Sequence, residues 1–233
     1  MIENYILNIE TSTKACSVSI SNDGVLLAVK ESVDMDYSHA EKLNLFIDEV
    51  IKSASLEFKQ LKAIAVSKGP GSYTGLRIGV STAKGLAYAL QIPLISIDTL
   101  GSMANGFLMN SKCLKSEILV PMIDARRKEV YMRIFDSELK SLSETEAKVI
   151  DVNSFDKWSS YNSIHLFGDG ADKFHDDFIN DDRVVIHKKF YPSAEFMVAL
   201  SYQKFKENNF EDVAYFEPFY LKDFIAIKPR KLF

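Results

Sequence analysis

Residues 67-SKGPGSYTGLRIGVSTAKGLAYAL-90 join a glycine-rich loop to a long run without further proline. Pro70 has no backbone donor, and the flanking Gly69 and Gly71 permit unusual backbone angles, so the chain must turn sharply here. An unbroken run of apolar and helix-forming residues follows this turn. The sequence therefore predicts a helix over residues 75–90.

This predicted helix carries a stripe of small residues along one face. Ser72 or Thr74 can cap its first turn. Each interior glycine costs roughly 1 kcal/mol relative to alanine, so a close contact must compensate for it. Either the stripe packs on the chain's own sheet, or a helix of a partner packs on it. The stripe consists of Gly75, Gly79, Ala83 and Ala87.

The loop before the helix also resembles a phosphate-binding turn, because glycine-rich turns present amides and the positive end of the helix dipole to an anion. The sequence does not match a P-loop, since Leu76 stands where lysine is required. It does not match a dinucleotide fingerprint either, since Thr74 occupies the position of the last glycine. We therefore do not expect this loop alone to bind phosphate tightly.

Composition points to a folded protein with a sizeable core, because 47% of the 233 residues are hydrophobic and 26% are charged. The net charge is −4 and the basic residues are dispersed, so binding of RNA would need a partner. The first apolar run is too short for a secretory or membrane segment, and a cytoplasmic protein without membrane attachment is expected. Cys16 and Cys113 lack the spacing of a zinc or redox pair and are expected to be reduced thiols.

Apolar periodicity over residues 1–98 predicts the order βββαβαβ. The strands are predicted at 5–9, 15–21, 25–31, 63–67 and 92–97, and the capping box Ser38-x-x-Glu41 predicts the start of the first helix. A similar but less sharply marked order follows a linking helix at 99–109. The sequence therefore predicts two α/β lobes, 1–98 and 99–233. In the second, strands are predicted at 117–123, 130–135, 147–150, 164–167 and 184–186, with helices near Phe155, at 174–179 and at 194–205.

Side chains that could carry chemistry are scarce. No two of the four histidines, at positions 39, 165, 175 and 187, have the spacing that forms a metal-binding pair on a helix, so no metal site is predicted. No nucleophile elbow occurs, and no catalytic residue is predicted. Two acidic and two basic side chains cluster in a predicted turn, where they pair with each other or bind a ligand: Asp124, Arg126, Arg127 and Glu129.

Six sequence blocks resemble the TsaB (YeaZ) family, the dimerisation subunits of the bacterial tRNA threonylcarbamoyladenosine machinery. They are ILNIETSTKACSVSI (6–20), SHAEKL (38–43), SKGPGSYTGLRIGVSTAKGLA (67–87), MIDARRKEVY (122–131), FGDG (167–170) and EPFYLKD (217–223). The resemblance implies the actin-like ATPase (ribonuclease H-like) fold, with two lobes that each have a mixed sheet of order βββαβαβ flanked by helices.

The resemblance also identifies candidates for cofactor binding, because the opening turn of this superfamily handles phosphate and magnesium. Related chains usually carry Asp where this one has Glu10, which is a longer acid. The catalytic paralogue TsaD binds its metal with a His-x-x-x-His helix, whereas here Leu43 stands four residues after His39. The candidates are Glu10, Thr11, Ser12, Gly69 and Gly71.

The function implied is that of a non-catalytic scaffold that binds and activates a TsaD-like catalytic subunit. A TsaE-like ATPase subunit is expected to join the complex, tRNA to be reached only through it, and the isolated chain to form a homodimer. ATP or ADP with magnesium is expected at the partner interface. The alternatives are a peptidase-like or nucleotide-dependent enzyme and a homodimeric nucleotide sensor. The implied interface residues are Leu43, Ile47, Gly75, Leu76, Arg77, Gly79, Val80, Ala83 and Ala87.

Overall fold

The first sheet has five strands in the order β3-β2-β1-β4-β5. The computed structural model describes residues 3–33 and 39–222. Strands β1 (Tyr5–Glu10), β2 (Ala15–Asn22) and β3 (Val25–Val33) are antiparallel, and β4 (Leu61–Gly69) and β5 (Leu94–Asp98) continue the sheet in parallel with β1. The five strands predicted for residues 1–98 are confirmed.

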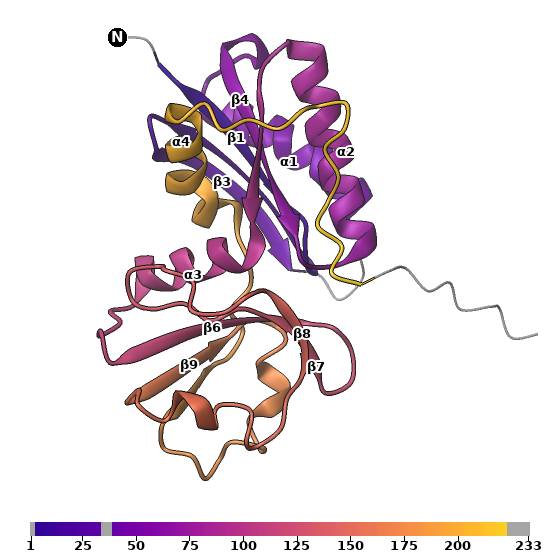
Figure 1. Cartoon of the computed structure of the whole chain (residues 1–233). Helices are drawn as coiled ribbons and strands as arrows, with labels where there is room; N and C mark the ends of the chain where they lie inside the picture. The colour runs from indigo at the N-terminus through magenta and orange to yellow at the C-terminus, as the bar shows by residue number, and fades with distance from the viewer. Residues whose placement is uncertain (1–2, 34–38, 223–233) are drawn as a thin grey trace, which may run out of the picture.

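Helices cover both faces of this sheet (Figure 1). Helices α1 (His39–Ser53) and α2 (Tyr73–Leu90) pack on one face, in a core shared with Leu7, Ile9 and Val66. On the other face, Ile6, Ala63 and Ile95 contact the segment that contains Met197. Because successive strand residues point to opposite faces, burial on both faces explains why these strands are apolar throughout. Ser38 of the predicted capping box lies outside the described residues.

The second sheet also has five strands, in the order β10-β9-β6-β7-β8, and it is mixed as predicted. Its strands are β6 (Glu117–Asp124), β7 (Glu129–Met132), β8 (Glu146–Val149), β9 (Ser163–Phe167) and β10 (Val184–His187). Helix α3 (Thr99–Asn110) links the sheets, and Phe107 packs against Phe167 of the second one.

Of the helices predicted within the second half, the one at 174–179 is wrong, and the one near Phe155 is a single 3-10 turn that begins at the next residue. In the described part of the chain, β8 and β9 are joined through the 3-10 turn η2 (Asp156–Trp158), and β9 and β10 through η3 (Asp172–Phe174). Phe155 and Phe174 are fully buried in the core of this sheet. Single large rings thus fill the core where the first half uses whole helix faces, and so the periodicity there is weak.

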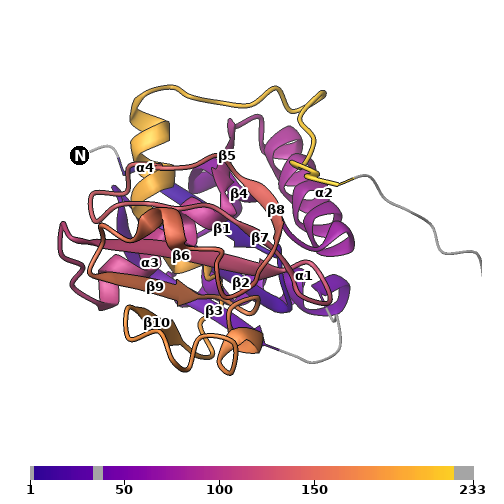
Figure 2. The same ribbon diagram turned by 60° about the horizontal axis from the view of Figure 1, so that its bottom comes forward.

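The chain then returns to the first sheet. The predicted helix at 194–205 forms as η4 (Ala194–Met197) followed by α4 (Val198–Lys206), and α4 packs on β1 and β5. Figure 2 shows the segment after α4 running from that helix to α2. Its Glu211 bridges Leu94 of β5. The boundary of the lobes at residue 98 stays a prediction, and these later residues pack against the sheet that precedes it.

Candidate functional site

The turn between β1 and β2 is closed around a buried carboxyl group. Glu10 is fully buried, and its Oε1 accepts hydrogen bonds from the backbone N of Ser12 at 2.6 Å and from Ser67 Oγ at 2.9 Å. Burial raises the pKa of the Glu10 carboxyl above its usual value. Within the described ranges, Oε2 has no hydrogen-bond partner. Glu10 therefore links the turn to β4 through hydrogen bonds in the protein interior.

The same turn contacts the small-residue face of α2. Thr11 Oγ1 donates to the carbonyl oxygen of Gly75 at 2.8 Å, and the backbone N of Ser72 donates to Ser12 O at 2.6 Å. A Cβ at Gly75 would lie 2.1 Å from Thr11 O, and one at Gly79 would lie 2.2 Å from Thr11 Oγ1. The stripe is therefore required by a contact inside the chain, which is the first of the two alternatives left open by the sequence.

The glycine-rich loop closes the other side of this turn. Gly69 has φ +104°, and its backbone N donates to Thr99 Oγ1 at 3.1 Å. A Cβ at Gly71 would lie 2.3 Å from Ser12 O. Ser72 is the N-cap of α2, since its Oγ accepts from the backbone N of Gly75 at 3.2 Å.

The structure thus brings the five predicted cofactor-binding residues together, but three of their backbone amides are bonded within the chain. The amides of Thr11, Ser12 and Gly69 already donate to Ser67 Oγ, Glu10 Oε1 and Thr99 Oγ1. A phosphate group needs free amides, and these three amides are already bonded within the chain. This turn does not fit a bound phosphate.

The predicted interface residues are mostly in the core. Eight of the nine are buried within the chain, and only Arg77 is exposed. Their role in binding a partner stays a prediction. Because the eight buried residues lie inside the chain, they contribute to the stability of its own fold. The outer faces of the same two helices carry exposed Leu45 on α1, 60% accessible, and Tyr88 on α2, 73% accessible.

The segment after α4 lies along α2, a contact that the sequence did not predict. Lys84 Nζ donates to the carbonyl oxygens of Ala214 and Phe216 at 3.1 and 2.9 Å. The backbone N of Phe219 donates to Lys68 O at 2.7 Å. Arg77 Nε donates to the hydroxyl of Tyr220 at 3.2 Å. Much of the EPFYLKD block is therefore hydrogen-bonded to the glycine-rich loop and to α2, and the yellow segment in Figure 1 runs along that helix.

The predicted charged cluster lies at the turn between β6 and β7, but its carboxylates pair with other residues than predicted. Asp124 pairs with Lys173 at 2.5 Å, and Glu129 pairs with Lys222. Asp169 Oδ1 accepts from the backbone N of Asp124 at 3.0 Å, and burial, to which the charge of Asp124 adds, raises the pKa of Asp169. Arg126 and Arg127 are exposed. Lysines far away in the sequence thus neutralise these carboxylates, and the arginines remain at the surface.

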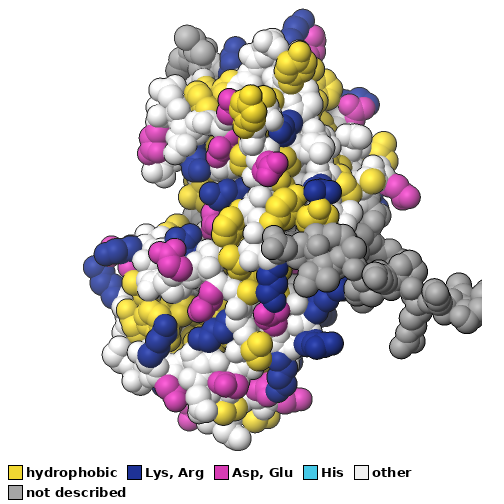
Figure 3. Space-filling model, turned by 45° about the vertical axis from the view of Figure 1, so that its right-hand side comes forward, with side chains coloured by type: hydrophobic (Ala, Val, Ile, Leu, Met, Phe, Trp, Pro, Cys, Tyr) yellow, Lys and Arg dark blue, Asp and Glu magenta, His cyan; other side chains and the backbone are white. Residues whose placement is uncertain are grey.

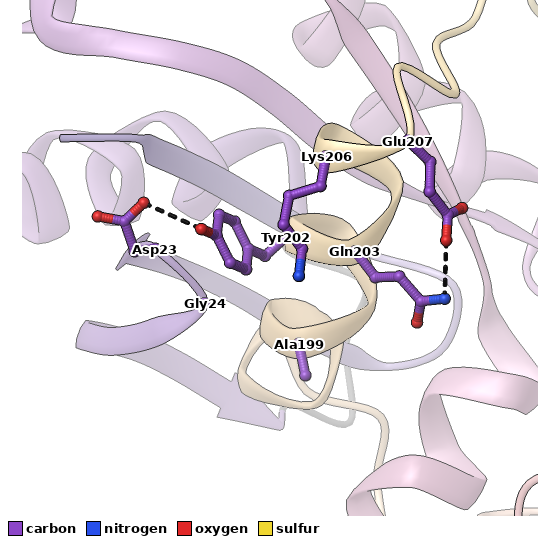
Figure 4. A pocket seen from close by; sticks show the side chains of 7 residues that line it. All are labelled: Asp23, Gly24, Ala199, Tyr202, Gln203, Lys206 and Glu207. Atoms are coloured by element: carbon purple, nitrogen blue, oxygen red, sulfur yellow. Dashed lines mark hydrogen bonds between the residues drawn. The ribbon is translucent and has the colours of Figure 1, made fainter. Parts of the chain in front are cut away.

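A broad hollow lies between the β2–β3 turn and α4 (Figure 4). Tyr202 donates its hydroxyl to Asp23 at 3.2 Å, and Gln203 Nε2 donates to Glu207 at 3.0 Å. The polar side chains of this hollow thus pair with one another and do not converge on a common point. Figure 3 shows basic and acidic side chains interspersed on another face of the molecule, without a broad patch of one sign. In the described residues, no helix has the length and apolar character needed to cross a membrane.

Comparisons with known proteins give a family model named for TsaD and relatives named TsaB. The model of the family described as "TsaD: tRNA N6-adenosine threonylcarbamoyltransferase" matches residues 34–222. The chain is 28% identical over 228 residues to the tRNA threonylcarbamoyladenosine biosynthesis protein TsaB of Escherichia coli, covering 96% of each. It is 36% identical over 126 residues to TsaB of Haemophilus influenzae, covering 54% of this chain and 51% of the relative.

A solved structure has the same fold. YeaZ from Pseudomonas aeruginosa matches with a TM-score of 0.78 at 23% identity, covering 94% of this chain and 100% of that one. This similarity confirms the predicted fold class, in which two five-stranded mixed sheets are flanked by helices.

Proposed function

The chain belongs to the family of TsaD, tRNA N6-adenosine threonylcarbamoyltransferase, and we propose that it is a non-catalytic, TsaB-type subunit that binds and activates a TsaD-like enzyme. Its place in tRNA threonylcarbamoyladenosine biosynthesis follows from its relatives of that name. The observation that carries the non-catalytic role is the closed opening turn, where Glu10, Thr11 and Ser12 bond within the chain.

The proposed partner surface is the outer side of α1 and α2. These helices are in contact, and Leu45 and Tyr88 on them are exposed to solvent. Burial of such side chains contributes about 25 cal/mol per Å² of apolar area, which suits a docking surface. A TsaD-like subunit occupies this surface in the complex, and a second copy of the chain occupies it when the chain is alone.

The remaining partners follow from the same role. A TsaE-like ATPase subunit joins the complex, which works in the cytoplasm, and tRNA is bound only by the assembly, because this chain has a net charge of −4. ATP or ADP with magnesium binds at the joint between subunits. The contacts that close the chain's own turn support this placement over binding by the chain alone.

The test is size-exclusion chromatography with light scattering on the chain, on a TsaD homologue and on their mixture. Leu45→Glu removes an exposed apolar side chain from the proposed surface, and Ile179→Glu is the matched control on the other lobe, with 60% and 66% exposure. We expect a mixed complex that Leu45→Glu abolishes and Ile179→Glu retains. Gly79→Leu is unsuitable here, because that position has no room for a side chain inside the chain itself.

Activity provides the second readout. Formation of threonylcarbamoyladenosine by the TsaD and TsaE homologues should depend on added chain and should fall with Leu45→Glu only. A chain that ignores the TsaD homologue, binds ATP tightly and hydrolyses peptides alone would overturn the proposal and favour the enzyme alternative.

A further inference from the structure

Three potential metal ligands from different segments meet at the edge of the second sheet. Cys113 precedes β6, Glu117 is its first residue, and His165 lies in β9. The Cys113 sulfur, a carboxylate oxygen of Glu117 and a ring nitrogen of His165 all lie within 4.8 Å of one another. None of these side chains belongs to the proposed partner surface or to the closed turn.

Strand register explains why these residues meet. β6 and β9 are parallel, and His165 pairs with Leu119, two residues beyond Glu117. Residues two apart share a face of a strand, so Glu117 and His165 are diagonal neighbours on one face. Phe107 of α3 covers this face, with its ring centroid 5.4 Å from that of His165. The site is therefore held by two strands and shielded by a helix.

The hydrogen bonds of His165 leave one nitrogen directed at the other two ligands. Its Nδ1 lies 3.0 Å from Nε2 of His187, and its Nε2 lies 3.4 Å from Oε2 of Glu117. That Nε2 is buried and has no hydrogen-bond partner among residues 3–33 and 39–222. A neutral His165 that donates from Nδ1 to His187 directs its Nε2 lone pair at a carboxylate and a sulfur. Glu117 Oε2 also accepts from the backbone N of Leu114 at 2.8 Å, so the atom that lacks a partner is His165 Nε2, and a cation among the three side chains would satisfy it.

We propose that Cys113, Glu117 and His165 form a zinc-binding site. Two ligands about 2.0 Å from a tetrahedral ion lie roughly 3.3 Å apart, close to the separation of His165 Nε2 and Glu117 Oε2. Sulfur and imidazole ligands favour zinc over magnesium or calcium. Zinc binding replaces the proton of the Cys113 thiol, which leaves to solvent, and a water molecule completes the coordination. His187 acts as the positioning residue that orients His165.

The sequence did not predict this site, because its histidine lies far along the chain from the other two ligands. Its one local sign was the spacing Cys113-x-x-x-Glu117. Neither Cys16 nor Cys113 is in a disulfide; Cys113 is half-buried, with its Sγ 3.7 Å from the carbonyl oxygen of Leu114, while Cys16 is buried in the first sheet.

The first experiment uses the full chain, reduced and stripped of metal with a chelator, and titrates it with Co²⁺ and then Zn²⁺. We expect one Co²⁺ per chain, a thiolate-to-cobalt absorption band in the near ultraviolet, and loss of this band when Zn²⁺ displaces Co²⁺. Cys113→Ser and His165→Gln should abolish the band and weaken zinc binding by roughly 100-fold or more. His175→Gln is the matched control, since His175 is an exposed histidine of the same lobe.

His187→Ala separates positioning from ligation: the cobalt band should persist while zinc binds roughly 10-fold more weakly. Circular dichroism and melting in chelator establish that each variant is folded. Zn²⁺ should also slow the reaction of Cys113 with a thiol reagent in the wild type and in His175→Gln. Absence of stoichiometric binding by the folded wild-type chain, or binding that Cys113→Ser and His165→Gln leave unchanged, would overturn the proposal.

Discussion

Thr11 Oγ1 donates a hydrogen bond of 2.8 Å to the carbonyl oxygen of Gly75, which joins the turn after β1 to the first turn of α2. This bond brings the turn so close to the helix that a Cβ at Gly79 would lie 2.2 Å from Thr11 Oγ1. The small-residue face of α2 is thus part of the monomer core, and the outer side of the helix remains for other contacts.

Gly79→Ala should destabilise the chain by about 1–3 kcal/mol, because its methyl group overlaps Thr11 Oγ1. Gly85→Ala in the same helix is the matched control, since a Cβ there meets nothing within 4 Å. The control should be neutral or should stabilise by up to about 1 kcal/mol, through helix propensity alone. Urea unfolding monitored by circular dichroism measures both. Equal effects of the two substitutions would contradict the close contact.

Thr11→Ala should partly rescue Gly79→Ala. Alone, the loss of the hydrogen bond to Gly75 costs about 1 kcal/mol. In the double variant the clashing oxygen is gone, so the double variant should be more stable than the sum of the single effects predicts. A double-mutant cycle in urea measures this coupling, and strictly additive effects would show that Thr11 is not the neighbour that excludes a side chain.

Glu10→Gln should change the dependence of stability on pH. Burial raises the pKa of Glu10 in the folded state, so the folded protein holds this proton more tightly than the unfolded chain does. Wild-type stability is therefore lost as pH rises from the unfolded pKa through the folded one, at about 1.4 kcal/mol per unit of pKa difference.

The neutral glutamine side chain avoids this loss, so the stability of Glu10→Gln relative to wild type should rise with pH and then level off. Urea unfolding between pH 5 and 8 tests this expectation. Glu144→Gln, at an exposed position, should show no such trend. A constant difference between wild type and Glu10→Gln would mean that the carboxyl titrates alike in both states.

Lys84→Ala should release the segment that lies along α2. The lysine donates to the carbonyl oxygens of Ala214 and Phe216, and Phe219 is bound to Lys68 farther along. Hydrogen exchange of the Phe219 amide should become about tenfold faster, which corresponds to roughly 1.4 kcal/mol. Lys62→Ala, at an exposed position of β4, is the control. An unchanged exchange rate of the Phe219 amide in Lys84→Ala would mean that other contacts hold the segment after α4 on the helix.

Ser72→Ala should destabilise α2 by about 1 kcal/mol, because Ser72 Oγ accepts the hydrogen bond from the backbone N of Gly75. The sequence left Ser72 and Thr74 as alternative caps, and the structure selects Ser72. Thr74→Ala, at an exposed position within the helix, should change stability little or raise it slightly. A larger loss in Thr74→Ala than in Ser72→Ala, measured by urea unfolding, would reverse this assignment.

The first half of the fold was predictable because its signals are local. Strands β1 and β4 and helix α2 each follow from residues within one element. The second half was predicted less well, because 3-10 turns anchored by single rings such as Phe155 and Phe174 carry no helical period. Strands β6 and β9 were still found, since most of their residues are apolar and buried.

The spacing of Gly75, Gly79, Ala83 and Ala87 was enough to predict a face of small residues on α2, because residue size and spacing are properties of a short segment. It did not determine what fills that face, since an internal turn and a partner helix require the same small residues. Only the tertiary contact with Thr11 decided between them. Tertiary structure likewise brought Cys113 and Glu117 to His165, because the parallel pairing of β6 and β9 joins positions that are distant along the chain.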